Sequence, residues 1–238
     1  MTADGSCHTA RRPPGGVAGE WLSVSPPSRS RVILLAGPSG SGKSSLAART
    51  GLPVLALDDF YKEDGDPTLP LLPGGTAVDW DAPDSWHADA AIAAISALCE
   101  QGSTDTPRYD ISASAISGWN RLDLAGAPHF VAEGIFAAEI AERCRALGLL
   151  ADAICLRGSP ATTARRRFVR DLREGRKSVR FLVRRGWHLF RAERAIVGRQ
   201  VGFGCSPCDQ REALARITRL GSAAPAATVP VSSPAAGG

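Results

Sequence analysis

The feature that most constrains this chain is a glycine-rich stretch, residues 37–45, which reads GPSGSGKSS. It follows Arg31–Ala36, an apolar run with the length of a buried strand, and leads into a short helical segment, Ser44–Thr50. In the pattern G-x-x-x-x-G-K-[ST], the P-loop, backbone N–H groups surround a phosphate, the lysine reaches the terminal phosphates and the hydroxyl binds Mg²⁺. The predicted phosphate contacts are Gly37, Ser39, Gly40, Ser41, Gly42, Lys43, Ser44 and Ser45, with Ser44 also a metal ligand.

The alternative for this stretch is a Gly/Ser turn that contains a lysine by chance. The chain has only three lysines, and a strand and a helix flank the motif on the required sides. We therefore expect the chain to bind a nucleoside triphosphate.

Strand-like and helix-like segments alternate along the rest of the chain, which predicts an α/β fold with a P-loop NTPase-type parallel sheet flanked by helices. Further strands are expected at Val54–Leu57, His129–Glu133 and Ala151–Leu156, with Ile196–Val201 as a candidate fifth strand. Helices are expected from Asp84, as the cap, through Cys99, over 137–147, and after Asp209, which forms a capping-box-like start with Glu212.

The chain has 238 residues, of which 44% are hydrophobic, enough for one sizeable core. We expect one domain over residues 30–220, between a flexible N-terminal segment, 1–29, and a flexible tail, 221–238, both rich in small residues and proline. No apolar run reaches the length of a membrane span, and the N-terminal arginines precede no apolar signal core. These features predict a cytoplasmic protein.

Positive charge is concentrated in one segment, residues 165–199, which carries thirteen Lys or Arg against three acids. The segment has a net charge of +10, and since the whole chain has +4, the remainder carries −6. A basic block on an otherwise acidic chain predicts an anionic partner, for which phosphates are the usual choice.

The six cysteines are mostly scattered singly among apolar neighbours, as reduced thiols are. Cys205 and Cys208 form one C-x-x-C, but a zinc site would need a second ligand pair at similar spacing. We expect two ordinary thiols there, with a redox pair as the alternative.

Two adjacent acids follow the second predicted strand, in the stretch VLALDDFYKE over residues 54–63. We expect this strand to be the neighbour of the first strand, so that its end lies close to the γ-phosphate. A carboxylate there can accept a proton from an attacking hydroxyl, and nearby aromatic side chains can wall a pocket for an organic acceptor. The alternative is that Asp58 and Asp59 form a solvated turn.

Over residues 31–176 the chain resembles the uridine-cytidine kinases, within the uridine kinase and phosphoribulokinase group of P-loop kinases. The resemblance rests on six motifs in order: GPSGSGKSS, DDFY, WDAPDSW, PRYD, VAEGI and RRRFVRDLREGR. It implies ATP as phosphoryl donor, with Asp58 as the catalytic base and Asp59 at a variable position. It also implies Glu133 as an acid near Mg²⁺, Asp81 on the ribose hydroxyls, Tyr109 on the nucleobase and Tyr61 as a further substrate contact.

The resemblance gives the basic block a role as an Arg-rich helical lid over about 160–178. It implies that Arg166 and Arg176 bind ATP, and that Arg167 and Arg170 act on the transferring phosphoryl group and contact the substrate. On a helix, residues 167 and 170 are three apart and share a face. The alternative is a solvated basic helix, and it stays open for the other arginines of the block.

The resemblance fails at two positions that contact the nucleobase in the family. Ser114 stands where the family has a pyrimidine-reading histidine, and an arginine near 184 stands where it has a glutamine. The tryptophans Trp80, Trp86 and Trp119 flank the acceptor motifs and are candidates for lining the acceptor pocket, with a plain core role as the alternative.

The sequence therefore predicts an ATP- and Mg²⁺-dependent kinase of a small alcohol, first the 5′-hydroxyl of uridine or cytidine, then pantothenate or nicotinamide riboside. Alternatives from other classes are an inactive ATP-binding regulator and an RNA-binding ATPase. Asp58 argues against the first, because a pure binder needs no base. The lid-like arrangement of the arginines, without an aromatic platform, argues against nucleic acid as the partner. The oligomeric state is left open.

Overall fold

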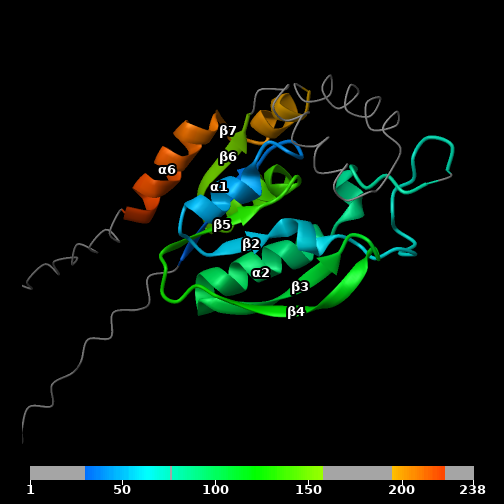
Figure 1. Ribbon diagram of the computed structural model, residues 1–238, viewed down its shortest axis with the longest axis horizontal. Coiled ribbons are helices and arrows are strands. Elements are labelled where there is room, and N and C mark those ends of the chain that lie inside the picture. Colours follow the sequence, from blue (N-terminus) through cyan, green and yellow to red (C-terminus); the bar gives the residue numbers. More distant parts are fainter. Residues whose placement is uncertain (1–29, 76, 158–194, 223–238) are drawn as a thin grey trace, which may run out of the picture.

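A computed structural model describes residues 30–75, 77–157 and 195–222. Its centre is a sheet of five parallel strands in the order β2-β5-β1-β6-β7 (Figure 1). The strands are β1 (Arg31–Ala36), β2 (Val54–Ala56), β5 (His129–Glu133), β6 (Leu150–Leu156) and β7 (Ser206–Cys208). Most residues of the central strands β1, β5 and β6 are apolar and buried, because both faces of the sheet are covered.

Helices cover both faces of the sheet, and alternate side chains of β1 show how the two cores divide. Ile33 and Leu35 pack with α1 (Lys43–Arg49) and α6 (Gln210–Ser222). Val32 and Leu34 pack with α2 (Ala88–Gln101), the 3₁₀ helix η3 (Ala137–Ile140) and α3 (Ala141–Ala146) on the other face. The predicted α/β fold is confirmed: a parallel sheet between two helical layers.

A two-stranded antiparallel hairpin stands beside this sheet and was not predicted. It consists of β3 (Ser103–Asp110) and β4 (Ala115–Asp123), and it lies against α2 and the 3₁₀ helix η1 (Leu57–Phe60). Many side chains of the hairpin are exposed, and its sequence has no continuous apolar run of the kind that marks a buried strand. The sequence therefore contains no signal for it. The hairpin carries the PRYD motif, and so brings one predicted acceptor residue, Tyr109, next to η1. Its turn carries Ser114, one of the positions where the family resemblance fails.

Two predicted boundaries are wrong. The second strand ends at Ala56 and not at Leu57, because the chain turns there into η1. The helix expected from Asp84 starts at Ala88: Asp84 lies in a separate 3₁₀ turn, Pro83–Ser85, and caps nothing. The predicted strands Arg31–Ala36, His129–Glu133 and Ala151–Leu156 agree with the structure to within one residue.

The predicted fifth strand, Ile196–Val201, is wrong, because residues 195–202 form a helix. Its partly and fully buried positions, 196, 197 and 200, have helical spacing, whereas Val201 is 40% exposed. The fifth strand is β7, Ser206–Cys208, parallel to β6. The capping box before α6 is confirmed: Asp209 Oδ1 accepts the Glu212 N–H at 2.9 Å, and Glu212 Oε2 accepts the Asp209 N–H at 2.9 Å.

Several predictions concern residues outside the described ranges. They are the N-terminal segment 1–29, the lid over 160–178 with its arginines, and the part of the tail after residue 222, while residues 221 and 222 themselves belong to α6. Among the described helices, none is both long and apolar enough to cross a membrane. The described cysteines, Cys99, Cys144, Cys155, Cys205 and Cys208, are buried free thiols.

Candidate active site

The glycine-rich loop joins β1 to α1 at the carboxyl edge of the sheet, as predicted. Gly37 is required by space, because a Cβ there would lie 2.8 Å from the Leu156 carbonyl oxygen and 3.0 Å from Ser41 Oγ. Gly42, with φ of 94°, is in the left-handed region at the start of α1. The loop therefore folds tightly over the end of β6.

The side chain of Lys43 is buried, with 6% of the residue exposed, and lies inside this loop. Its Nζ donates to the carbonyl oxygens of Gly37 at 3.0 Å and Pro38 at 3.3 Å. The loop is also held from the C-terminal part of the chain, since Gln210 Nε2, at the first position of α6, donates to the Ser41 carbonyl at 3.1 Å. No sequence signal marked Gln210.

Glu133 ends β5 beside the loop and is 8% exposed. Burial raises the pKa of its carboxyl group, and a hydrogen bond with Ser44 and the charge of Lys43 oppose that rise. Its Oε2 is buried and has no hydrogen-bond partner among the described residues. A buried carboxylate oxygen without a partner, beside a P-loop serine, fits a magnesium ligand.

Magnesium in kinases takes one or two protein ligands and completes its shell with phosphate oxygens and water. The described residues contain no cluster of three or more His, Cys, Asp or Glu able to hold a metal. Of the described residues, Ser44 and Glu133 fit this pattern and would hold Mg²⁺ together with the nucleotide.

Asp58 lies in η1, immediately after β2, with an exposed side chain. We expected its strand to be the neighbour of β1, but β5 lies between them. The register pairs Ala56 with Glu133, so η1 meets the turn that follows β5. There Asp58 Oδ1 accepts the Ile135 N–H at 3.2 Å, and its charge contributes to the raised pKa of Glu133.

Gly134 makes this approach of Asp58 possible. A Cβ on Gly134 would lie 2.8 Å from Leu57 Cβ and 2.9 Å from Asp58 Oδ1. The E-G pair of the VAEGI motif thus has a steric basis. The glutamate places a carboxylate beside the P-loop, and the glycine leaves the space that the Asp58 carboxylate occupies.

Asp59 has a different environment from its neighbour. It is half-buried, and its Oδ1 accepts the Tyr109 N–H at 3.1 Å, joining η1 to β3. Burial raises its pKa, against the lowering effect of this hydrogen bond. The two acids are thus not a solvated turn: one is tied to the hairpin, and the other lies next to Glu133.

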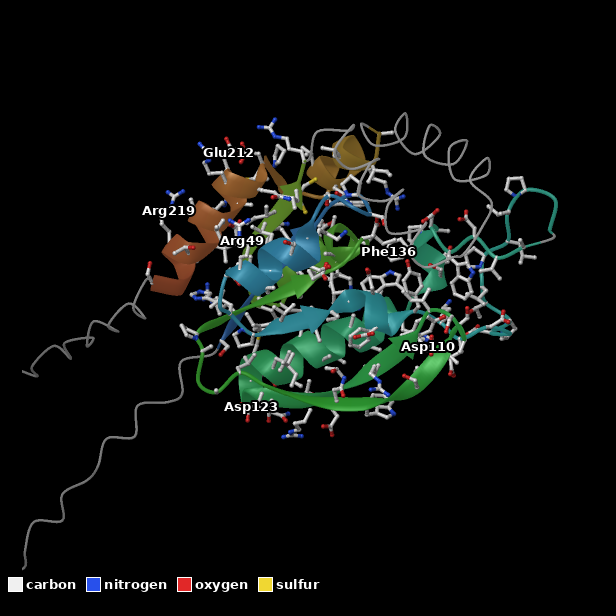
Figure 2. All side chains as sticks on the ribbon, viewed as in Figure 1. Arg49, Asp110, Asp123, Phe136, Glu212 and Arg219 are labelled. Carbon is white, nitrogen blue, oxygen red and sulfur yellow. The ribbon has the colours of Figure 1, made fainter. Side chains whose placement is uncertain are left out.

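Aromatic side chains stand next to these acids, in the region of Figure 2 around the labelled Phe136. The Tyr61 ring lies 6.0 Å from that of Trp80, 5.8 Å from that of Tyr109 and 5.9 Å from that of Phe136, measured between centroids. Trp86 is buried and stacks on Phe136 at 5.6 Å. Trp80 and Trp86 therefore belong to this cluster, which Phe136, not singled out from the sequence, completes.

Tyr61 is the centre on which several predicted substrate residues converge. Its hydroxyl donates to the Trp80 carbonyl at 3.3 Å. Its pKa is raised strongly, first by burial and then by the charges of Asp58 and Asp81, which places both acids near its ring. Asp81 itself is exposed.

The hairpin positions its own residues around Tyr109. The Tyr109 hydroxyl donates to the Lys62 carbonyl at 3.0 Å and is also hydrogen-bonded by Ser114, which has φ of 49° in the β3–β4 turn. Trp119, by contrast, is 66% exposed on β4 and is not part of the aromatic cluster.

The structure thus brings Lys43, Ser44, Glu133 and Asp58 to one edge of the sheet, with the aromatic cluster beside Asp58. The remaining predicted residues, Arg166, Arg167, Arg170 and Arg176, lie outside the described ranges.

No protein-family model and no curated protein sequence matches this chain. Among solved structures, a candidate fructose transport system kinase from a Silicibacter species aligns with a TM-score of 0.51 at 21% identity, over 71% of this chain and 84% of that one. A possible uridine kinase from Bacillus stearothermophilus aligns with a TM-score of 0.41 at 16% identity, over 57% and 74%. Phosphoribulokinase from Rhodobacter spheroides aligns with a TM-score of 0.46 at 15% identity, over 73% and 68%.

The first of these alignments covers most of both chains, and at its level of identity it is evidence of fold. The chain therefore shares the fold of that structure, an α/β fold with a parallel sheet flanked by helices, as the sequence predicted.

Proposed function

We propose that this protein is an ATP-dependent kinase that transfers the γ-phosphoryl group to a hydroxyl of a small acceptor. The observation that carries the proposal is the position of Asp58, whose carboxylate lies beside Glu133 and is bonded by the Ile135 N–H at 3.2 Å. A carboxylate next to a triphosphate site can accept the proton of an attacking alcohol.

The other residues of the edge take complementary roles in this proposal. Lys43 leaves the loop carbonyls to pair with the terminal phosphates, and its charge stabilises the transferring group. Ser44 and Glu133 would hold Mg²⁺, which would supply positive charge against the nucleotide phosphates. Arg167 and Arg170, with Arg166 and Arg176, supply further positive charge from the basic segment.

The acceptor class follows from the wall beside Asp58. The ring centroid of Tyr61 lies within 6 Å of those of Tyr109 and Phe136, and aromatic rings grouped in this way suit a planar or ring-containing acceptor. We propose the 5′-hydroxyl of uridine or cytidine first, with Asp81 on the ribose hydroxyls. Because Ser114 replaces the expected histidine and already bonds Tyr109, pantothenate, nicotinamide riboside or another small alcohol is the second choice.

The acceptor can be identified by measuring ADP release with MgATP across a panel of nucleosides, sugars and vitamin alcohols. Turnover with one class of acceptor, well above ATP hydrolysis alone, is the expected result. ATP binding without turnover of any acceptor would instead support the regulator.

With the acceptor in hand, Asp58→Asn is expected to lower kcat about 10²- to 10⁴-fold while MgATP still binds, because the proton acceptor is removed and the shape is kept. Asp59→Asn is the matched control. It keeps an oxygen to accept the Tyr109 N–H and should lose far less activity. Equal turnover of Asp58→Asn and the wild type would remove Asp58 from the mechanism.

A further inference from the structure

A buried glutamine lies in the helix over residues 195–202, outside the predicted catalytic set. Gln200 is 4% exposed, and both ends of its amide are hydrogen-bonded. Its Oε1 accepts from Cys155 Sγ, in β6, at 3.1 Å, and its Nε2 donates to the Ile135 carbonyl at 3.2 Å. The side chain thus bridges the central sheet and the turn after β5.

The contact with Ile135 leads directly to Asp58. The Ile135 N–H donates to Asp58 Oδ1 at 3.2 Å, while its carbonyl accepts from Gln200. The same turn is held on its other side by Gly134, whose N–H donates to the Leu35 carbonyl at 3.3 Å. Ile135 is therefore bonded through both backbone polar groups, once to the proposed base and once to Gln200.

Packing alone does not account for a glutamine here. Val197, on the same helix, and Phe203, just after it, already pack against the apolar core, and Arg199 pairs with Glu139 at 2.9 Å to dock the helix on η3. An amide at a buried position loses its hydration and is tolerated only when its groups are paired. An apolar side chain would fill the space without that requirement but would leave the Ile135 carbonyl without its donor.

We propose that Gln200 is a positioning residue for Asp58. By holding the Ile135 carbonyl, it fixes the backbone whose N–H orients the Asp58 carboxylate at the phosphate site. The role as a positioning residue for catalysis rests on the proposed function, whereas the hydrogen-bonded link from Gln200 to Asp58 does not.

The link is tested first without any reaction. In protein labelled with ¹⁵N-isoleucine, Gln200→Leu should shift the Ile135 amide resonance and speed its hydrogen exchange about tenfold, because the hydrogen bond to Asp58 loosens. Asp58→Asn should perturb the same resonance. Arg199→Gln is the matched control, since it loosens the same helix without removing the contact with Ile135. An unchanged Ile135 amide in Gln200→Leu would overturn the proposal.

The kinetic consequence is tested with the acceptor found in the panel. Gln200→Leu should lower kcat about 10- to 100-fold with KM for MgATP within about twofold, because misplacing a catalytic group affects the chemical step. Arg199→Gln should keep kcat near the wild-type value. A purely structural role predicts instead that both variants lose activity in proportion to their loss of thermal stability, and that result would also overturn the proposal.

The two arms separate the failure of this inference from the failure of the proposed function. If the wild-type protein phosphorylates no acceptor, the kinase proposal fails, and the amide measurements still decide whether Gln200 holds the Asp58 turn. If the wild type is active and Gln200→Leu changes neither the resonance nor the hydrogen exchange of the Ile135 amide, only the inference about Gln200 fails.

Discussion

Two aspartates one residue apart have different environments in this protein. Consecutive side chains on a 3₁₀ helix point about 120° apart, so η1 turns Asp59 toward the hairpin and Asp58 toward the turn after β5. Asp59 bonds the Tyr109 amide, and Asp58 bonds the Ile135 amide. The different roles proposed for two identical side chains follow from this local geometry.

At the same scale, Gly134→Ala should damage both stability and turnover. The new methyl would lie within 3 Å of Leu57 Cβ and Asp58 Oδ1, so both neighbours must shift. We expect a loss of about 1–3 kcal/mol in the free energy of unfolding and a fall in kcat of tenfold or more, measured by urea denaturation and by the kinase assay.

Gly198→Ala is the control for this substitution. Gly198 lies in the helix over 195–202, has no described atom within 4 Å of the added Cβ, and should gain about 0.5–1 kcal/mol from helix propensity. Wild-type turnover in Gly134→Ala would show that Asp58 does not need its present position.

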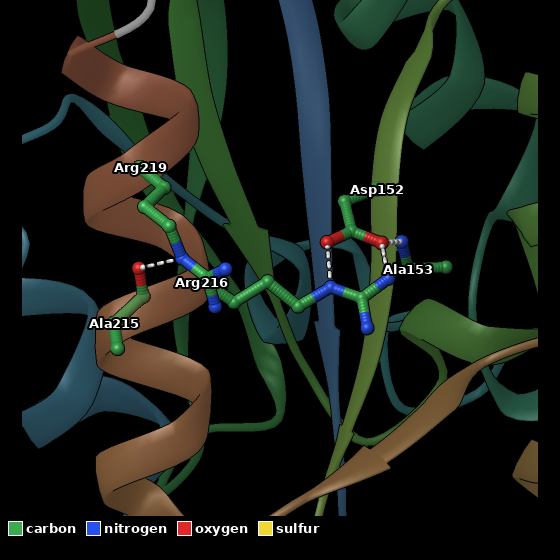
Figure 3. A network of polar contacts seen from close by, with 5 residues as sticks. All are labelled: Asp152, Ala153, Ala215, Arg216 and Arg219. Carbon is green, nitrogen blue, oxygen red and sulfur yellow. Dashed lines mark hydrogen bonds and ion pairs between the residues drawn. The ribbon is translucent and has the colours of Figure 1, made fainter.

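At the scale of elements, an ion pair shown in Figure 3 helps to hold α6 on the sheet. Arg216 donates from Nη2 to Asp152 Oδ1 at 2.8 Å and from Nε to Oδ2, while the Asp152 side chain, on β6, is only 10% exposed. The hydrogen bond with Asp152 raises the pKa of Arg216. The first residue of α6, Gln210, donates a hydrogen bond to the Ser41 carbonyl of the P-loop. The ion pair that holds α6 on the sheet therefore also helps to hold the loop.

Arg216→Met is therefore expected to destabilise the protein by about 1–2 kcal/mol, because it leaves a largely buried carboxylate without its cation. Asp152→Asn, added to Arg216→Met, should recover part of this loss by removing the unpaired charge. Thermal and urea unfolding of the single and double variants measure both effects.

Arg219→Met provides the comparison, since Arg219 bonds only the Ala215 carbonyl of its own helix among the contacts drawn (Figure 3). It should change stability little. A double variant less stable than Arg216→Met would contradict the account of an unpaired buried charge.

At the scale of the whole molecule, the charged form of the buried Glu133 carboxyl group lowers the free energy of unfolding. Glu133 is buried with an oxygen that lacks a partner among the described residues, and its pKa is raised. A carboxyl group with a raised folded-state pKa stabilises the fold below its unfolded pKa, near 4.5, and this contribution is lost as pH rises through the folded pKa.

It follows that Glu133→Gln should stabilise the nucleotide-free protein relative to the wild type, increasingly so as pH rises from 5 to 8. Urea denaturation in EDTA measures the difference, and Glu100→Gln, at an exposed position near the end of α2, is the control. The same variant should lose most of the extra stabilisation that Mg²⁺ adds to nucleotide binding. A Gln variant no more stable than the wild type at pH 8 would show that Glu133 is not a strained carboxylate.

Local sequence alone determined the phosphate loop, four of the five sheet strands and the capping box of α6. These features depend on neighbours within a few residues: the spacing of glycines and lysine, continuous apolar runs, and an acid three residues from its partner. The interactions that produce these features are between residues close in the sequence, so they can be recognised in the sequence alone. The local sequence likewise showed that Asp58 and Glu133 are acids at the ends of strands.

Only the tertiary structure decided how those ends meet. The sheet order places β5 between β1 and β2, so Asp58 reaches the phosphate loop by way of Glu133 and Gly134. The hairpin β3–β4, the Phe136 ring and the Gln200 amide join the site through contacts between residues 50 to 75 positions apart or packed across elements. Such contacts are set by how the layers pack. No residue near Gln200 in the sequence indicates that its amide donates a hydrogen bond to Ile135, the residue whose N–H binds Asp58.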